Sequence, residues 1–159
     1  MPKLDGTESI YQISGTTTHT GGEMGGGSGY LLTSFDNSGD WELTAQAKFS
    51  GQNCCIGVFK DGATAREQNE MGITAYKTTS FWYTNGTYSD LYSDGRHLSA
   101  NTYYTTTIKK QNGTITTTIN GVTRTLSWSS GTSPLHIGVG GWGTTGNVCT
   151  IKDIVVKPL

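Results

Sequence analysis

The amino-acid sequence predicts an all-β protein in which two antiparallel sheets pack face to face as a sandwich. The composition is dominated by two residue types: there are 23 glycines, and threonine is more common still. Threonine favours strands and glycine marks turns. Asn-Gly pairs at 112–113 and 120–121 separate strand-like runs, and this pair is the strongest short-range signal for a hairpin. Residues 40–50 alternate between apolar and polar side chains, which is the period of a half-buried strand.

The last third of the chain predicts five successive strands, at residues 102–111, 114–120, 122–126, 135–140 and 148–157. Both residues of each Asn-Gly turn should have positive φ. Alternation in the fifth strand breaks around Asp153 and Ile154, so we expect either a bulge there or a strand that is buried on both faces.

The strand at 40–50 has the clearest pattern. Its odd-numbered residues from Trp41 to Phe49 should be buried. Its polar side, which should be exposed, consists of Glu42, Thr44, Gln46 and Lys48. The next strand, at 53–60, is apolar on both faces, so we expect it in the middle of a sheet with both faces covered.

The chain divides into two segments by composition. Residues 1–27 should form an N-terminal strand at 8–13 and a flexible segment rich in glycine and threonine, which is either a loop or a linker. Residues 28–159 should form one sandwich domain. Its further strands are expected at 30–34, 69–77, 79–84 and 87–92, with a loop at 61–68 and an Asn-Gly turn at 85–86.

The order of the late strands is particular. An aromatic-led strand, an Asn-Gly turn, a short strand and a second Asn-Gly turn precede the run from Pro134 to Trp142 (PLHIGVGGW) and a closing IKDIVV at 151–156. This order resembles the C-terminal half of the concanavalin A-like lectin/glucanase jelly rolls, a group that includes laminin-G-like domains. The resemblance extends over residues 30–159. It implies a jelly-roll sandwich and a non-catalytic protein of the kind found in phage tails, fibres and adhesins.

The charge of the chain is low and balanced, with 11 Lys and Arg against 12 Asp and Glu. No basic stripe is present to neutralise phosphates, which argues against a nucleic-acid partner. No apolar run is long enough for a membrane span and no signal-sequence pattern is present, so we expect no membrane partner. A neutral surface rich in glycine, threonine and tyrosine suits an uncharged polar ligand such as a glycan.

Three cysteines, an odd number, exclude a complete disulfide framework. We expect Cys54, Cys55 and Cys149 to be small buried side chains in a protein made in a reducing compartment. A bridge from one of the first two to Cys149 is the competing interpretation, and it requires their strands to be neighbours. No zinc-site spacing accompanies the thiols.

The motifs of catalysis are missing from the sequence. Glycoside hydrolysis needs two carboxyl groups that face one cleft, and the glucanases that this chain resembles carry a Glu-x-Asp-x-Glu run. Here Glu67 and Glu70 are three residues apart, which would place them on opposite faces of a strand. The related alginate lyases would require paired arginines and a Gln-x-His triplet. We therefore expect no enzymatic activity, and we expect His136, between Leu135 and Ile137, to be structural.

The strongest candidate binding residues lie in the predicted hairpin and loop at 81–97 and in a tryptophan flanked by glycines. Aromatic rings pack on the C–H faces of sugars, and nearby charged groups hydrogen-bond the hydroxyls. The candidate ligand-binding residues are Trp82, Tyr88, Asp90, Tyr92, Asp94, Arg96 and Trp142. A place in the core is the competing interpretation for the aromatic members, because Trp82 has the opposite parity from Phe81 and Tyr83.

No cofactor is expected to be required. The resemblance does imply a structural calcium ion with a ligand from the final strand, and Asp153 matches that position. Asp5 and Glu8 are candidates for an N-terminal partner ligand. Calcium needs about six to eight oxygen ligands, and no dense acidic loop is present, so an exposed aspartate beside Lys152 is the competing interpretation.

Two classes of function follow. The first is a carbohydrate-binding or adhesion module that recognises a cell-surface glycan, either on a virion, as part of a phage tail or fibre made in the host cytoplasm, or on a microbial cell surface. Homo-oligomers and other virion or fibre subunits are its expected partners. The second is an assembly or decoration domain that binds no sugar. A glycoside hydrolase or lyase is the remaining alternative.

Overall fold

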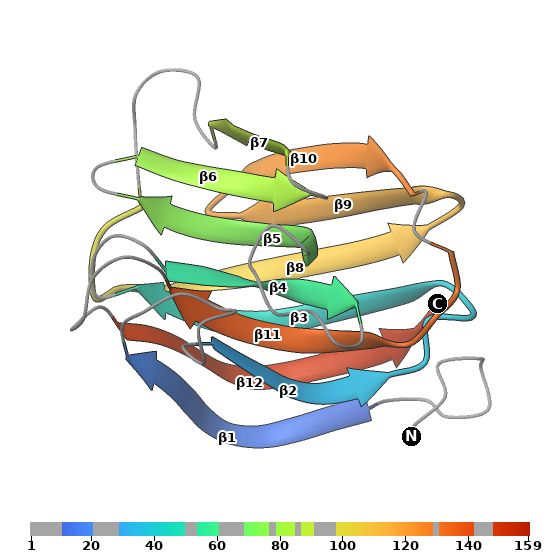
Figure 1. The fold of residues 1–159 in the computed structure, drawn as a ribbon, viewed down its shortest axis with the longest axis horizontal. Helices are drawn as coiled ribbons and strands as arrows, with labels where there is room; N and C mark the ends of the chain where they lie inside the picture. Colours follow the sequence, from blue (N-terminus) through green and yellow to red (C-terminus); the bar gives the residue numbers. More distant parts are fainter. Residues whose placement is uncertain are drawn as a thin grey trace.

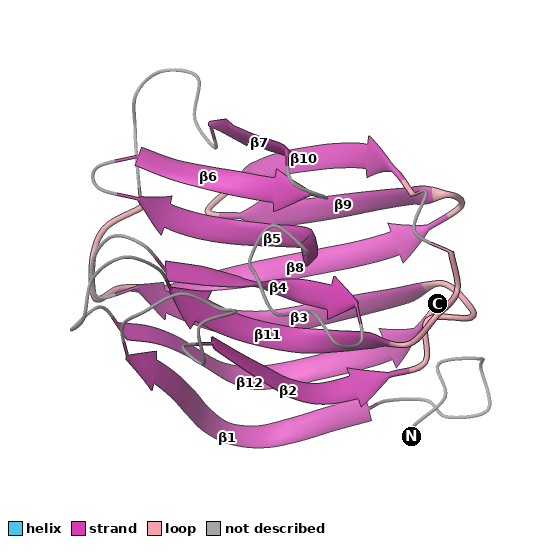
Figure 2. Cartoon of the chain, viewed as in Figure 1, coloured by secondary structure: helices cyan, strands magenta, loops and turns pink. Residues whose placement is uncertain are grey.

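The computed structural model describes residues 11–20, 29–49, 54–60, 69–76, 79–84, 87–90, 98–128, 131–141 and 148–159. These residues form twelve strands in two sheets, and every strand pair within a sheet is antiparallel. Figure 2 shows strands and loops but no helix in this part of the chain. No helix in the described ranges is therefore long and apolar enough to cross a membrane. The predicted all-β, two-sheet antiparallel sandwich is confirmed.

The two sheets lie one behind the other (Figure 1) and have six strands each. Sheet A has the order β1 (Tyr11–Thr20), β12 (Val148–Pro158), β3 (Trp41–Phe49), β8 (Tyr103–Gln111), β9 (Thr114–Ile119) and β10 (Val122–Ser127). Sheet B has the order β2 (Gly29–Phe35), β11 (Leu135–Gly141), β4 (Cys54–Lys60), β5 (Asn69–Tyr76), β6 (Thr79–Thr84) and β7 (Thr87–Asp90).

The five strands predicted in the last third of the chain are all present, as β8 to β12. The two turns that define them have the expected backbone. Asn112 and Gly113 have φ of 51° and 75°, and Asn120 and Gly121 have φ of 48° and 76°. Positive φ at both central residues is the requirement of the tight hairpin turn that favours Asn-Gly. The third such pair, at 85–86, lies outside the described residues.

The first strand differs from its prediction. β1 begins at Tyr11 and continues to Thr20, whereas the sequence predicted a strand at 8–13 and a flexible segment after it. The pairing with β12 supplies the reason: Gln12 lies opposite Val155 and Thr17 lies opposite Ile151, with a register shift between Ile13 and Thr16. Hydrogen bonding to a neighbouring strand therefore extends the strand through a sequence with little apolar pattern.

The core lies between the sheets, and β3 shows how the alternation builds it. Trp41, Leu43, Ala45 and Ala47 are at most 2% exposed, as predicted, while the side chain of Phe49 is not among those described. The rings of Phe35 in sheet B and Trp41 in sheet A meet edge to face at 4.9 Å. The polar residues of β3 are half-buried rather than exposed. Side chains of the adjacent strands contact three of them: Lys157 of β12 pairs with Glu42, and Thr105 and Tyr103 of β8 contact Gln46 and Lys48.

The fourth strand is central and covered on both faces, as its sequence predicted. β4 lies between β11 and β5 in sheet B. Val58 belongs to the core, yet Gly57 and Phe59, on the opposite face, are buried as well. Its cysteines pair with glycines of β11, whereas Cys149 lies in sheet A opposite Phe49, so the strands of the thiols are not hydrogen-bonded neighbours.

The irregularity predicted near Asp153 is a bulge. The register between β12 and β3 shifts between Lys152 and Val155, and Asp153 is exposed with φ of 53°. Ile154 and Val156 both face the core, since the extra residue resets the alternation of the strand.

Candidate functional site

The register of sheet B places Trp82 on the face that packs into the core. Trp82 pairs with Ile73 on β5, and Ile73 pairs with Ile56 on β4. Directly opposed residues share a face, and Ile56 shares its face with Val58 because side chains alternate along a strand. Val58 is completely buried in the core cluster. Trp82 therefore occupies a core-facing position of the sheet.

Two other candidate residues take the opposite face of the same sheet. Tyr88 pairs with Tyr83, and Asp90 pairs with Phe81. Thr74 on β5 pairs with Phe81, so it lies on this face as well. We call it the outer face of sheet B; its positions on the described strands include Cys55, Gly57, Phe59, Gly72, Thr74, Phe81, Tyr83, Tyr88, Asp90 and His136. The register thus separates Trp82 from Tyr88 and Asp90.

The remaining four ligand-binding candidates, Tyr92, Asp94, Arg96 and Trp142, lie outside the described residues.

The centre of the outer face of sheet B is covered. Phe59 is completely buried although it lies opposite to Val58, and it pairs with His136, which is half-buried. Leu135 and Ile137 are buried in the core, so His136 lies on the face away from them, as its sequence context predicted. The outer face of sheet B therefore combines a covered centre with an aromatic region on β6 and β7.

A polar network closes one end of the sandwich, and its centre is Asn37. The Asn37 side chain is fully buried; its Nδ2 donates to the carbonyl oxygens of Gly131 at 3.2 Å and Ser133 at 3.1 Å. Its Oδ1 accepts from Trp41 Nε1 at 2.8 Å and from Lys110 Nζ at 3.1 Å. Two donated and two accepted bonds use the whole capacity of a side-chain amide.

Lys110 supplies the charge of this network. Its Nζ also donates to the carbonyl oxygens of Asn37 at 2.7 Å and Gly39 at 3.1 Å, and it lies 5.4 Å from the centroid of the Trp128 ring. Burial lowers the pKa of Lys110 below its ordinary value, and the charges of Asp40 and Asp36 oppose this shift. The polar atoms of Asn37 and Lys110 are already paired with protein groups, so the network holds two loops together rather than binding a ligand. The sequence contained one indication of a buried lysine, because Lys110 has the same strand parity as the buried Ile108.

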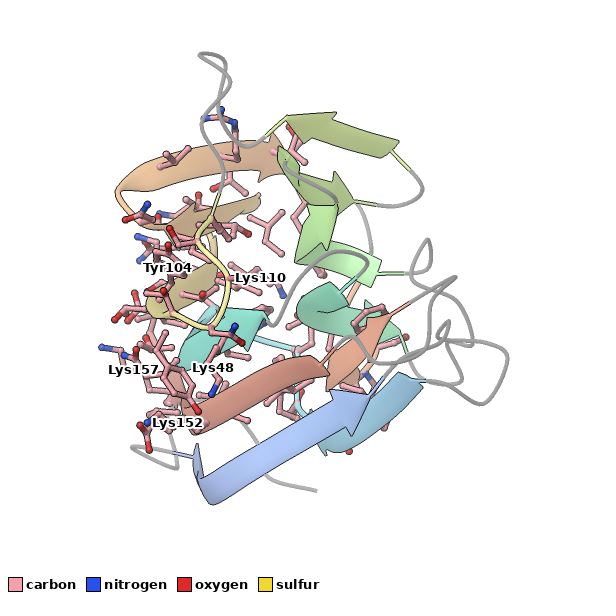
Figure 3. The ribbon with its side chains drawn as sticks, turned by 90° about the vertical axis from the view of Figure 1, so that its left-hand side faces the viewer. Lys48, Tyr104, Lys110, Lys152 and Lys157 are labelled. Carbon is pink, nitrogen blue, oxygen red and sulfur yellow. The ribbon has the colours of Figure 1, made fainter. Side chains whose placement is uncertain are left out.

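Charged and aromatic side chains gather on the outer face of sheet A, which is the face turned away from the core. On β3 and β8 this face includes Gln46 and Lys48, with Thr105 and Tyr103 opposite them. The ammonium of Lys48 lies 4.7 Å from the centroid of the Tyr103 ring, and that of Lys152 lies 4.1 Å from the same centroid. Gln46 donates to the hydroxyl of Thr105 at 2.8 Å. In Figure 3, Lys48, Lys152 and Lys157 lie along sheet A, while Lys110 points into the space between the sheets. The sequence reasoning missed this cluster, because its members come from three strands.

Metal binding has no support in the described ranges, where no group of three or more His, Cys, Asp or Glu side chains is placed to hold an ion. Asp153, the candidate calcium ligand, is exposed in its bulge. Its candidate partners Asp5 and Glu8 lie outside the described residues. The calcium site remains a prediction.

No protein-family model matches the sequence, and no curated protein does either. Solved structures do match the fold. A functionally unknown protein from Saccharomyces cerevisiae aligns at 13% identity with a TM-score of 0.62, over 98% of this chain and 95% of its own. The carbohydrate-binding module CBM66 from Bacillus subtilis aligns at 12% identity with a TM-score of 0.55, over 99% of this chain and 98% of its own.

The alginate lyase AlgAT5 of polysaccharide lyase family 7 aligns at 14% identity with a TM-score of 0.56, over 79% of this chain. This chain spans 62% of the length of that lyase. At such identities the matches establish the fold alone: a concanavalin A-like jelly-roll sandwich, shared by a carbohydrate-binding module and by polysaccharide lyases.

Proposed function

We propose that this protein is a non-catalytic carbohydrate-binding module. The observation that supports the proposal most directly is the alignment with CBM66 over nearly the whole length of both chains. The low, balanced charge of the chain is in keeping with a neutral glycan as the ligand.

The glycan site in this proposal is the aromatic region of the outer face of sheet B. Tyr88 and Asp90 share this face with Tyr83, at positions that are adjacent across β6 and β7. A tyrosine ring offers a surface to the C–H face of a pyranose, and a carboxylate accepts hydrogen bonds from its hydroxyls. An open platform of this kind leaves much water in place, so single-site affinity should be weak, with avidity arising from several copies.

The experiment is a glycan-array screen of the purified protein, followed by titration of the best ligand against single variants. Tyr88→Ala and Asp90→Ala should each weaken binding about tenfold or more while leaving the thermal unfolding curve nearly unchanged. Thr125→Ala, on the outer face of sheet A, is the matched control and should bind as wild type does. Wild-type affinity in both sheet B variants would refute this site.

The assembly-domain alternative has a different signature, which the same variants reveal. If the outer face of sheet B formed a subunit contact, Tyr88→Ala would lower the oligomeric mass measured by light scattering, and no glycan on the array would bind.

A virion or cell-surface setting remains a prediction from the sequence. The expectation that the protein has no enzymatic activity also remains a prediction, and incubation with the array ligands followed by product analysis tests it.

A further inference from the structure

The outer face of sheet A gathers positive charge in a chain whose net charge is −1. Register positions on this face hold Lys48, Lys109, Lys152 and Lys157, and Glu42 is the one acid among the described residues at those positions. Glu42 pairs with Lys157 at 3.2 Å. The exposed Asp153 lies in the adjoining bulge. Among the described residues, the outer face of sheet A is therefore basic, with four lysines against Glu42 and the neighbouring Asp153.

Two of these lysines have no acidic partner among the described residues. The ammonium groups of Lys48 and Lys152 lie against one aromatic ring, that of Tyr103, at 4.7 and 4.1 Å from its centroid. The ring attracts each cation, while the two cations repel each other. Within the described ranges no carboxylate pairs with either ammonium. An anion that binds between them would relieve the repulsion and keep both ring contacts.

The spacing of the charges fits a chain rather than a small ion. Tyr103 and Lys109 are six residues apart on β8, which corresponds to roughly 20 Å along a strand, and their side chains take the same face. Between these ends the face presents uncharged hydrogen-bonding groups: the Gln46 amide and the hydroxyls of Thr44, Thr105 and Thr107, in register across β3 and β8. A ligand for this face therefore needs anionic groups at intervals and hydroxyl groups between them.

We infer that the outer face of sheet A binds an extended polyuronate chain. Its carboxylates pair with Lys48 and Lys152 at one end and with Lys109 at the other, and its sugar hydroxyls bond Gln46 and the threonines. This site lies on the opposite side of the sandwich from the proposed neutral-glycan site on sheet B. The two proposals therefore fail independently.

The experiment is isothermal titration of the full chain with polygalacturonate oligosaccharides at low salt. Lys48→Gln with Lys152→Gln should weaken binding about tenfold, since two exposed ion pairs are lost. Lys48→Arg with Lys152→Arg is the matched control: it keeps both charges and should bind within about twofold of wild type. Raising the salt concentration from about 0.01 to 0.15 M should weaken wild-type binding, because the shorter screening length reduces attraction between exposed charges.

Further ligands and variants make the assignment specific. Tyr88→Ala and Asp90→Ala should leave polygalacturonate binding unchanged, whereas a loss in these variants would move the site to sheet B. Equal affinity for uncharged dextran would overturn the role of the carboxylates. Tighter binding of heparin or of duplex DNA than of polygalacturonate would overturn the choice of a polyuronate, and wild-type affinity in the double glutamine variant would overturn the site itself.

Discussion

Replacing Asn37 with alanine should strongly destabilise the fold. The substitution deletes four hydrogen bonds at once and leaves the Trp41 indole N–H, which is fully buried, without its acceptor. A net contribution of about 1 kcal/mol for each neutral bond, and nearer 2 kcal/mol for the bond from the Lys110 ammonium, gives a loss of roughly 5 kcal/mol. Domains of this kind are stable by only about 5–15 kcal/mol.

The assay is urea unfolding followed by tryptophan fluorescence, with the free energy of unfolding extrapolated to water. Ser38→Ala is the control one residue away, because Ser38 is exposed and its backbone N–H keeps its 2.8 Å bond to the Asp36 side chain. It should change the free energy of unfolding by less than about 0.5 kcal/mol.

A second variant removes one donor of the network. Trp41→Phe deletes the indole N–H together with part of the buried ring, and it should cost less than Asn37→Ala because it removes one hydrogen bond rather than four. In the double variant the two costs should not add, because both changes remove the same bond. The reasoning fails if Asn37→Ala costs less than about 1 kcal/mol, or if the two costs are strictly additive.

Three further outcomes are expected. Leu43→Ala should cost about 2–5 kcal/mol of unfolding free energy and Gln46→Ala much less, because Leu43 is 2% exposed in the core and Gln46 is half-buried on the outer face of sheet A; equal costs would mean that the register of β3 is wrong. Gly121→Ala should cost about 1 kcal/mol in the same assay, since its φ of 76° strains a residue with a Cβ, and no loss would contradict the turn type. The pKa of Lys110 is lower in the folded protein than in the unfolded chain, so the unfolded chain keeps this proton to a higher pH. The free energy of unfolding of wild type minus that of Lys110→Met should therefore rise with pH between the lowered pKa and pH 10.5. A difference that is flat or falls with pH would contradict the shift.

The sequence predicts this fold well where local chemistry decides it. Asn-Gly turns and the alternation of β3 are local signals, so strands β8 to β10 and the buried side of β3 follow from a few residues each. β1 was predicted less well, because its strand depends on pairing with β12, which lies more than a hundred residues later in the chain. Long-range pairing of this kind leaves little trace in a composition rich in threonine and glycine.

The candidate site is predicted less completely than the fold. Parity alone showed that Trp82 and its neighbours take opposite faces, but the choice of face needed the register from β6 through β5 to β4. The partners of Lys110 in the Asn37 network, and the grouping of Lys48 and Lys152 on Tyr103, were not visible in the sequence, since these contacts join residues that are 49 or more positions apart. Clusters of this kind arise from sheet topology rather than from any motif.

The most direct test of the central claim is an amide chemical-shift titration of the labelled protein with the best neutral glycan from the array. We expect the largest shifts on β6 and β7, at Thr79–Thr84 and Thr87–Asp90, with β9 and β10 unaffected. Shifts confined to sheet A, or an array on which no glycan binds, would contradict the proposal that this sandwich recognises carbohydrate through the outer face of sheet B.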